Sequence, residues 1–389
     1  MSVTAPEGFV ASGLASGIKA SGAPDLALVA ATGGPVPAAG VFTANLAAAA
    51  PVQVSRAHLA ASAGRAAAVV LSSGNANAAT GAPGVAAALR MCALVGEGLG
   101  VSASEILVCQ TGLIGVPFPM APVESGIPVL VEARVAGRDA ARRAATAIMT
   151  TDTVCKEVVV DGTGFTVGGM AKGAAMLAPN MATMLAVLTT DAHCDPGVLS
   201  AALRHAVEAT FNRMSIDGCT STNDTVLVLA NGASGTPVPV DSLTDALEQA
   251  CGELAGMMAA DAEGASKVAR VVVKGASSDE EAHRAARKVA DSLLVRCSLN
   301  GGDPYWGRVV SELGSAGVAF DLDRVEVAYG GVVVCRAGVA AEHDDGALRA
   351  HMQGRAIELS CDLGLGAGTG AVLTTDLGHG YIDENRTTS

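Results

Sequence analysis

Short runs of β-branched and aliphatic residues alternate with stretches of helical periodicity along most of the chain. Residues 67–71 form one buried run, and residues 83–98 after it place apolar side chains at helical spacing. Further strands are predicted at residues 106–108, 157–160, 183–188, 225–229, 268–273, 357–361 and 371–377. Further helices are predicted at residues 138–149, 195–213, 242–262 and 278–296. This alternation is typical of an α/β protein, and we expect two layered α/β lobes with mixed sheets.

Turn and capping residues suggest where these elements begin and end. Asp241 or Ser242 is a candidate N-cap of one helix, and Ser278 with the acidic residues after it caps another. Gly330-Gly331 predicts the turn of a hairpin. A length of 389 residues favours two lobes. The glycine-rich stretch 161–180 is the nearest candidate for a linker between them.

Composition excludes several classes of function. The net charge of −13, without a basic patch, argues against nucleic-acid binding. No uncharged apolar run has the roughly 18 residues that a membrane span needs, and residues 1–10 do not resemble a signal peptide. We therefore expect no membrane association and a cytoplasmic location. The nine cysteines form no Cys-x-x-Cys pair and the histidines show no ligand spacing, so no metal site is predicted.

The segment 178–185, Ala-Pro-Asn-Met-Ala-Thr-Met-Leu, carries the most informative chemistry. It places the Ala182-Thr183 bond between a Pro-Asn turn and an apolar run. If that bond breaks, Thr183 gains a free α-amine beside its own hydroxyl, which together make a base and a nucleophile. From the residues alone, Thr183 is equally an ordinary β-branched strand residue.

Other positions could complete such a site. The Thr111-Gly112 turn after a strand offers backbone N–H groups for an oxyanion hole, although a plain loop explains it as well. Lys172 is the only charged residue between Asp161 and Asp191. Glu263 and Thr150 stand near helix ends, where surface and capping roles are the simpler explanations. No complete dinucleotide, phosphate-loop or serine-hydrolase motif is present.

Taken together, the motifs resemble one family, the ornithine acetyltransferases, which are bifunctional glutamate N-acetyltransferases of arginine biosynthesis. The matching segments occur in family order across nearly the whole chain. They are residues 172–185, 109–115, 148–152, 221–225, 261–264, 303–308 and 381–385.

The resemblance implies an autoprocessed fold of the N-terminal-Thr nucleophile type. Cleavage of the Ala182-Thr183 bond would give an α chain of residues 1–182 with the oxyanion hole and a β chain of residues 183–389 that begins with the nucleophile. An acetyl group would then pass from N-acetylornithine to glutamate through acetyl-Thr183, in a ping-pong cycle that yields ornithine and N-acetylglutamate. Two α and two β chains from one precursor type would form a heterotetramer. No cofactor is implied, and acetyl-CoA is a further donor substrate in some members.

The roles of individual residues follow from matching positions. Thr111 and Gly112 would form the oxyanion hole. Substrate contacts would come from Thr150, Lys172, Thr183, Glu263, Asn385 and Ser389. The chain departs from the family pattern in its C-terminal tail, 386–389, which puts the Ser389 contact in doubt, and at Tyr305, where asparagine is usual.

Two other functions are compatible with the same residues. One is a hydrolase that uses the N-terminal Thr to release acetate from acyl-amino acids. The other is a non-catalytic amino-acid-binding protein in which Thr183 is only a strand residue.

Overall fold

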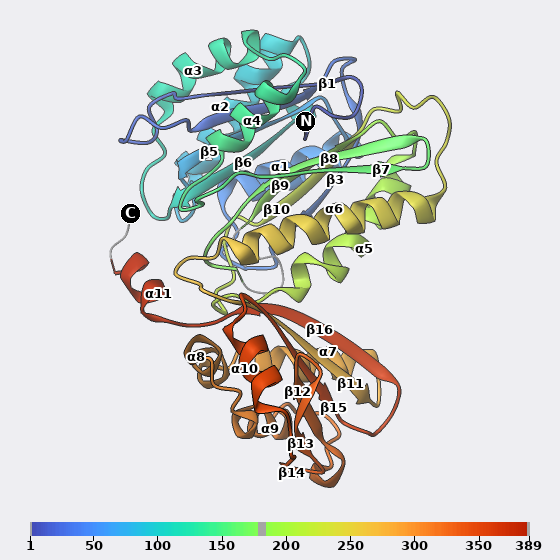
Figure 1. The fold of residues 1–389 in the computed structure, drawn as a ribbon. Helices are drawn as coiled ribbons and strands as arrows, with labels where there is room; N and C mark the ends of the chain where they lie inside the picture. Colours follow the sequence, from blue (N-terminus) through green and yellow to red (C-terminus); the bar gives the residue numbers. More distant parts are fainter. Residues whose placement is uncertain (1, 178–183, 387–389) are drawn as a thin grey trace. The chain divides into compact units, whose positions relative to one another are not determined.

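The computed structural model describes residues 2–177 and 184–386 of the chain. Its contacts divide these residues into two compact units (Figure 1). The first unit contains residues 2–177, 184–212 and 219–258, and the second contains residues 213–218 and 259–386.

The first sheet of unit 1 is four-stranded, with the order β1-β2-β5-β6. Its strands are β1 (Phe9–Leu14), β2 (Leu26–Ala31), β5 (Ala68–Asn75) and β6 (Ile106–Leu113). Only β5 and β6 pair in parallel. One face is covered by α1 (Ala50–Ala61), α2 (Gly81–Leu99) and α3 (Met120–Glu132), whose apolar side chains share a core with that face.

The second sheet of unit 1 has six strands in the order β4-β3-β10-β9-β8-β7. They are β3 (Val36–Phe42), β4 (Arg65–Ala66), β7 (Lys156–Gly162), β8 (Phe165–Lys172), β9 (Leu185–Thr190) and β10 (Thr225–Ala230). The two sheets share a buried core, which also takes in α4 (Arg138–Ala147). Figure 1 shows α5 (Pro196–Ala209) and α6 (Val240–Ala260) on the far side of the second sheet. Unit 1 is therefore built in layers of helices, two sheets and helices.

Small residues let these layers approach closely. The buried face of α4 consists of alanines, and β1 passes directly over that helix. A Cβ on Gly13 would lie 2.3 Å from the carbonyl oxygen of Arg143, so only glycine fits there. Close backbone packing of this kind is how a chain with 3% aromatic residues fills its core.

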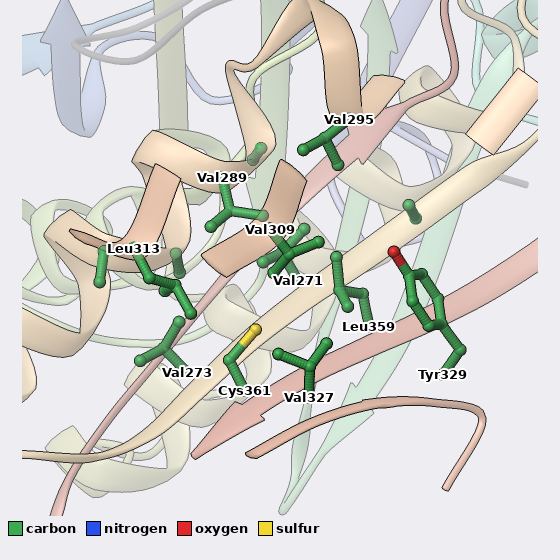
Figure 2. Packing of buried hydrophobic residues seen from close by; sticks show 14 of the residues in the cluster. Val271, Val273, Val289, Val295, Val309, Leu313, Val327, Tyr329, Leu359 and Cys361 are labelled. Carbon is green, nitrogen blue, oxygen red and sulfur yellow. The ribbon is translucent and has the colours of Figure 1, made fainter. Parts of the chain in front are cut away.

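Unit 2 has one mixed sheet with the order β14-β13-β12-β15-β11-β16. Its strands are β11 (Val268–Ala276), β12 (Glu326–Tyr329), β13 (Val332–Arg336), β14 (Val339–Ala340), β15 (Ala356–Asp362) and β16 (Gly368–Thr375). Its helices are α7 (Asp279–Ala290), α8 (Leu293–Gly301), α9 (Trp306–Gly314), α10 (Asp345–Gln353) and α11 (His379–Glu384). Figure 2 shows the valines and leucines of β11, β12 and β15 packed against those of α7, α8 and α9.

The structure confirms the α/β class with mixed sheets and most of the predicted elements. The hairpin turns at Gly330-Gly331, where both residues have positive φ, as the sequence predicts. The predicted helix over 278–296 is instead two helices, because Ser292 accepts the N–H of Val295 and caps the second. The predicted cap at Asp241 or Ser242 is wrong, since α6 begins at Val240.

Two further expectations concern the chain's division. The glycine-rich stretch 161–180 is not a linker, because its described part forms most of the β7–β8 hairpin. The predicted boundary between residues 182 and 183 is the peptide bond that cleavage would break. It does not coincide with the division into compact units, and it stays a prediction.

Among the described residues, α2 is the one helix long and apolar enough to cross a membrane by composition. It carries Arg90 and Glu97, which form an ion pair. Its buried residues Met91, Cys92 and Val95 pack into the core against the first sheet. These contacts are those of a core helix.

Candidate active site

Four strand ends meet at one edge of the second sheet of unit 1. The strand register places Lys172, the last residue of β8, beside Leu185, the first of β9. Leu185 in turn pairs with Thr225, the first residue of β10, which lies opposite Phe42 at the end of β3. Because antiparallel strands end where their neighbours begin, residues just outside these strands collect at this edge.

Met184 is fixed at this edge from both sides. Its N–H donates to Oδ1 of Asp224 at 2.9 Å, and its carbonyl accepts the N–H of Thr225 at 3.1 Å. The predicted nucleophile, Thr183, and the predicted cleavage bond lie outside the described residues. Met184 is covalently bonded to Thr183 and is the first described residue before β9.

The predicted oxyanion-hole residues lie at the end of β6. Thr111 is buried and pairs with Ser73, and Gly112 pairs with Gly74. Gly112 has φ +130°, and a Cβ on it would lie 2.3 Å from the Gly74 carbonyl carbon. This position therefore requires glycine, and the neighbouring backbone is held in a fixed geometry.

Asn223 joins the end of β6 to the start of β10. Its Nδ2 donates to the carbonyl oxygens of Gln110 at 2.9 Å and Ala76 at 2.6 Å. Gln110 directly precedes Thr111, and Asn223 directly precedes Asp224. Thr111 and Gly112 lie within β6 and not in the predicted turn, and they are thereby tied to the edge that holds Met184.

A buried carboxylate, Asp152, brings two other predicted site residues to this region. It accepts the N–H of Thr150 at 3.1 Å and that of Gly173 at 2.7 Å. Its oxygens lie 2.6 Å from Nζ of Lys156 and 3.9 Å from Nζ of Lys172. Burial alone would raise the pKa of Asp152, but the charges of Lys172 and Lys156, together with hydrogen bonds from Lys156 and Gly173, lower the pKa to about 2.

A third lysine extends this cluster. Nζ of Lys19 donates to the carbonyls of Pro24 and Met149. Burial lowers the pKa of Lys19, and the charge of Lys172 acts in the same direction, opposed by Asp25 and Asp152. Lys19 therefore lies within electrostatic reach of Lys172 and of both Asp25 and Asp152.

Asp224 is the functional candidate to which the sequence analysis gave no role. Its side chain is fully buried, and its Oδ2 has no hydrogen-bond partner within the part of the chain that the structure describes. Burial raises its pKa well above the ordinary value, against the opposing effects of the Met184 N–H, the Ser221 hydroxyl and the Lys172 charge. The one sequence signal is an acidic residue placed directly before the apolar strand 225–229.

Unit 2 brings Glu263 and Asn385 together. Nδ2 of Asn385 donates to Oε2 of Glu263 at 2.8 Å. Next to them, the N–H of Gly264 donates to Glu384 at 3.1 Å. A Cβ on Gly264 would lie 2.0 Å from the backbone nitrogen of Tyr381, so glycine is required there also. Ser389 lies outside the described residues, and the roles of Glu263 and Asn385 toward a substrate stay predictions.

Two other features of the described residues bear on the site. A cavity of about 710 Å³ lies between α2 and residues 115–120, and none of the predicted substrate contacts lines it. No group of three or more histidine, cysteine, aspartate or glutamate side chains among these residues is arranged to hold a metal ion.

Comparison with known proteins identifies the family. The sequence model of the ArgJ family matches residues 10–387. The chain belongs to the ArgJ family. The resemblance seen in the sequence is thereby confirmed, because relatives named arginine biosynthesis bifunctional protein ArgJ match nearly its whole length.

Two such relatives show the degree of similarity. The ArgJ of Mycolicibacterium paratuberculosis is 49% identical over 98% of this chain and 95% of its own. The ArgJ of Streptomyces coelicolor is 45% identical over 99% of both chains. A solved ornithine acetyltransferase from Mycobacterium tuberculosis, complexed with ornithine, is 48% identical over 46% of this chain and 94% of its own, with a TM-score of 0.44.

Replacing Gly112 with alanine should destabilise this ArgJ-family chain strongly. The new Cβ would meet the Gly74 backbone, so we expect a loss of roughly 3 kcal/mol or more in the free energy of unfolding. Gly115→Ala is the matched control, because Gly115 also has positive φ but nothing lies within 4 Å of its would-be Cβ. That control should lose only about 1–2 kcal/mol. Denaturant unfolding checks both values, and equal losses would contradict the packing argument.

Replacing Asp152 with asparagine should leave buried lysine charges uncompensated. We expect a loss of about 3–5 kcal/mol at pH 7, as for other broken buried ion pairs. The folded-state pKa is lowered to about 2, so the stabilisation by Asp152 is complete above the unfolded pKa of about 3.9 and disappears as pH falls toward 2. The difference in the free energy of unfolding between wild type and variant should therefore become smaller from pH 7 to pH 3, as measured by denaturant unfolding.

The surface carboxylate Glu124 provides the control for this experiment. It pairs with Arg90, and the two side chains are 48% and 46% exposed. Glu124→Gln should cost less than about 1 kcal/mol. A loss for Asp152→Asn that is no larger than this, or one that does not change with pH, would contradict the buried-pair interpretation.

Proposed function

We propose that this chain is a bifunctional enzyme of arginine biosynthesis that cleaves its own Ala182-Thr183 bond and then transfers acetyl from N-acetylornithine to glutamate. Full-length similarity to ArgJ proteins supports the pathway. The observation that carries the proposal is the sheet edge of unit 1. There Asp224, Asn223 and Gln110 link Met184 to the Thr111-Gly112 end of β6. The strand register places Lys172 beside Leu185 at the same edge.

The proposed transfer uses the new N-terminus as base and nucleophile. The α-amine of Thr183, with an ordinary pKa of about 7.7, accepts the hydroxyl proton as the oxygen attacks the acetyl carbonyl of N-acetylornithine. The carbonyl oxygen becomes negative and is stabilised by Thr111 and Gly112. The C–N bond breaks, the proton passes to the departing amine, and ornithine leaves acetyl-Thr183 behind. The amine of glutamate then attacks the carbonyl carbon of this ester. The ester C–O bond breaks, the amine proton passes to the Thr183 oxygen, and N-acetylglutamate departs.

The charges around the site suit these substrates. Lys172 is buried at the end of β8, and its positive charge favours binding of the α-carboxylate that both substrates carry. Thr150 is held beside it through Asp152. In unit 2, Glu263 is assigned to the side-chain ammonium of ornithine, and Asn385, its hydrogen-bond partner, is assigned to the substrate as well.

Several further properties belong to the same proposal. The processed protein is a heterotetramer of two α and two β chains and acts in the cytoplasm without a cofactor. Acetyl-CoA is a second acetyl donor to be tested rather than a bound group. Ser389 is assigned as a contact through its position at the C-terminus.

Mass spectrometry of the purified, denatured protein tests self-cleavage. Wild type should give polypeptides of 182 and 389 − 182 = 207 residues, and Thr183→Ala should give one intact chain. Thr189→Val is the control, because Thr189 is a buried threonine of β9 with a structural hydrogen bond to Val3. It should cleave normally. An intact wild-type chain that still transfers acetyl would contradict the mechanism.

The same preparation separates the acetyl-transfer reactions. N-acetylglutamate should form from glutamate with N-acetylornithine as donor, and a second reaction with acetyl-CoA shows whether that donor is accepted. Acetate release without N-acetylglutamate would identify a hydrolase instead.

Replacing Glu263 with glutamine tests the assignment in unit 2. Loss of the carboxylate charge should lower kcat/KM for N-acetylornithine roughly 10- to 100-fold, the value of a charge-assisted hydrogen bond of about 1.5–3 kcal/mol. Self-cleavage should be unchanged. Glu384→Gln, which alters a neighbouring carboxylate bonded to Gly264, is the control and should change kcat/KM little. Equal effects of both variants would contradict a substrate role for Glu263.

A further inference from the structure

Self-cleavage poses a chemical problem that the mature enzyme does not have. The proposed base in acetyl transfer is the α-amine of Thr183, but this amine exists only after the Ala182-Thr183 bond is cut. In the uncut chain the same nitrogen belongs to a peptide bond and has no useful basicity. The first reaction therefore needs a different group to accept the Thr183 hydroxyl proton.

Asp224 is the described residue whose placement fits this need. One carboxyl oxygen, Oδ1, holds the N–H of Met184 at 2.9 Å, and that nitrogen is bonded to the carbonyl carbon of Thr183. The other oxygen, Oδ2, is buried and makes no hydrogen bond to any part of the chain that the structure describes. A buried carboxyl oxygen without a partner costs folding free energy, and a catalytic role is one reason for a protein to carry such a group.

The oxygens of the other buried carboxylate of this region already have ion-pair and hydrogen-bond partners. Asp152 contacts Lys156 and accepts two backbone N–H groups, and its pKa is lowered to about 2, which makes it a poor base. Around Asp224, by contrast, the side chains of Ser221, Asn223 and Thr225 are neutral, and Lys172 at the end of β8 is the charge that acts on it. Burial raises the pKa of Asp224, which suits a group that must take up a proton and return it.

We propose that Asp224 is the proton acceptor for cleavage of the Ala182-Thr183 bond. This inference rests on the proposed function and concerns the same site before maturation. Asp224 Oδ2 takes the hydroxyl proton of Thr183 while the hydroxyl oxygen bonds to the carbonyl carbon of Ala182. The C–N bond then breaks, and the proton passes from Asp224 to the departing nitrogen, which becomes the α-amine. Water hydrolyses the resulting ester, leaving the carboxylate of Ala182 and the free hydroxyl of Thr183.

The experiment follows cleavage of newly synthesised full-length precursor in a cell-free system, sampled over time on denaturing gels between pH 5 and pH 9. Asp224→Asn keeps the side-chain shape and a carbonyl oxygen for the Met184 N–H but cannot accept the proton. It should slow cleavage roughly 100-fold. The wild-type rate should rise with pH as the carboxyl ionises and then level off, whereas this dependence should be absent in Asp224→Asn.

Asp191→Asn is the matched control. Asp191 follows the other end of β9 and also accepts a backbone N–H, that of Thr166 at 2.7 Å. It should cleave at the wild-type rate with the wild-type pH profile, and melting curves of all three proteins should show that they are folded.

The possible outcomes distinguish the inference from the proposed function. An Asp224→Asn chain that cleaves at the wild-type rate, or more slowly but with the wild-type pH profile, overturns the role of Asp224. A wild-type rate that does not change with pH overturns it without reference to any variant. A wild-type chain that does not cleave at all overturns the proposed function itself.

Discussion

The pairing of β9 with both β8 and β10 is the constraint on which the candidate site depends. Its register sets Lys172, Leu185 and Thr225 side by side. The residues just outside these strands are therefore also placed next to one another. Met184 is then bonded on both sides, to the side chain of Asp224 and to the backbone of Thr225. A shift of one residue in β9 would turn its side chains to the opposite faces and move Met184 away from Asp224.

The pKa values of two buried carboxylates near this edge are shifted in opposite directions. Lysines surround Asp152 and keep it ionised, so it acts as a fixed negative charge that organises Lys172, Gly173 and Thr150. Asp224 has less compensation, and burial dominates its pKa. Pairs of acidic groups with separated pKa values commonly divide into a structural or electrostatic role and a proton-transfer role.

Local patterns predicted most of the elements, because the apolar periodicities of β5, α2, β10 and β11 are visible within a few residues. They could not predict the order of strands in the second sheet, where β10 and β9 lie between β3 and β8. That order depends on backbone pairing between segments far apart in the chain. The helix break at Ser292 was missed because the residues on both sides continue a helical pattern.

In the candidate site, too, the sequence predicts some features and only the fold shows others. Family motifs identified Thr111, Lys172 and Glu263 as candidates, but only the fold shows that Asn385 lies 2.8 Å from Glu263 across 122 positions of sequence. Asp224 has no distinctive local pattern, since its importance comes from an oxygen left unpaired by its surroundings. Burial and hydrogen-bond satisfaction depend on the whole structure, so a sequence pattern does not reveal them.

The strand order of the second sheet also determines when the proposed cleavage can happen and what it leaves behind. Strands β3, β4, β7 and β8 precede residue 182, whereas β9 and β10 follow it and occupy the middle of the sheet. During synthesis the first 182 residues therefore cannot close this sheet until residue 230 has left the ribosome. After the cut, backbone hydrogen bonds of β9 with β8 and of β10 with β3 still join the two pieces. Scission would thus remove one covalent bond while these strand pairings remain, and the two pieces should stay together as long as unit 1 is folded.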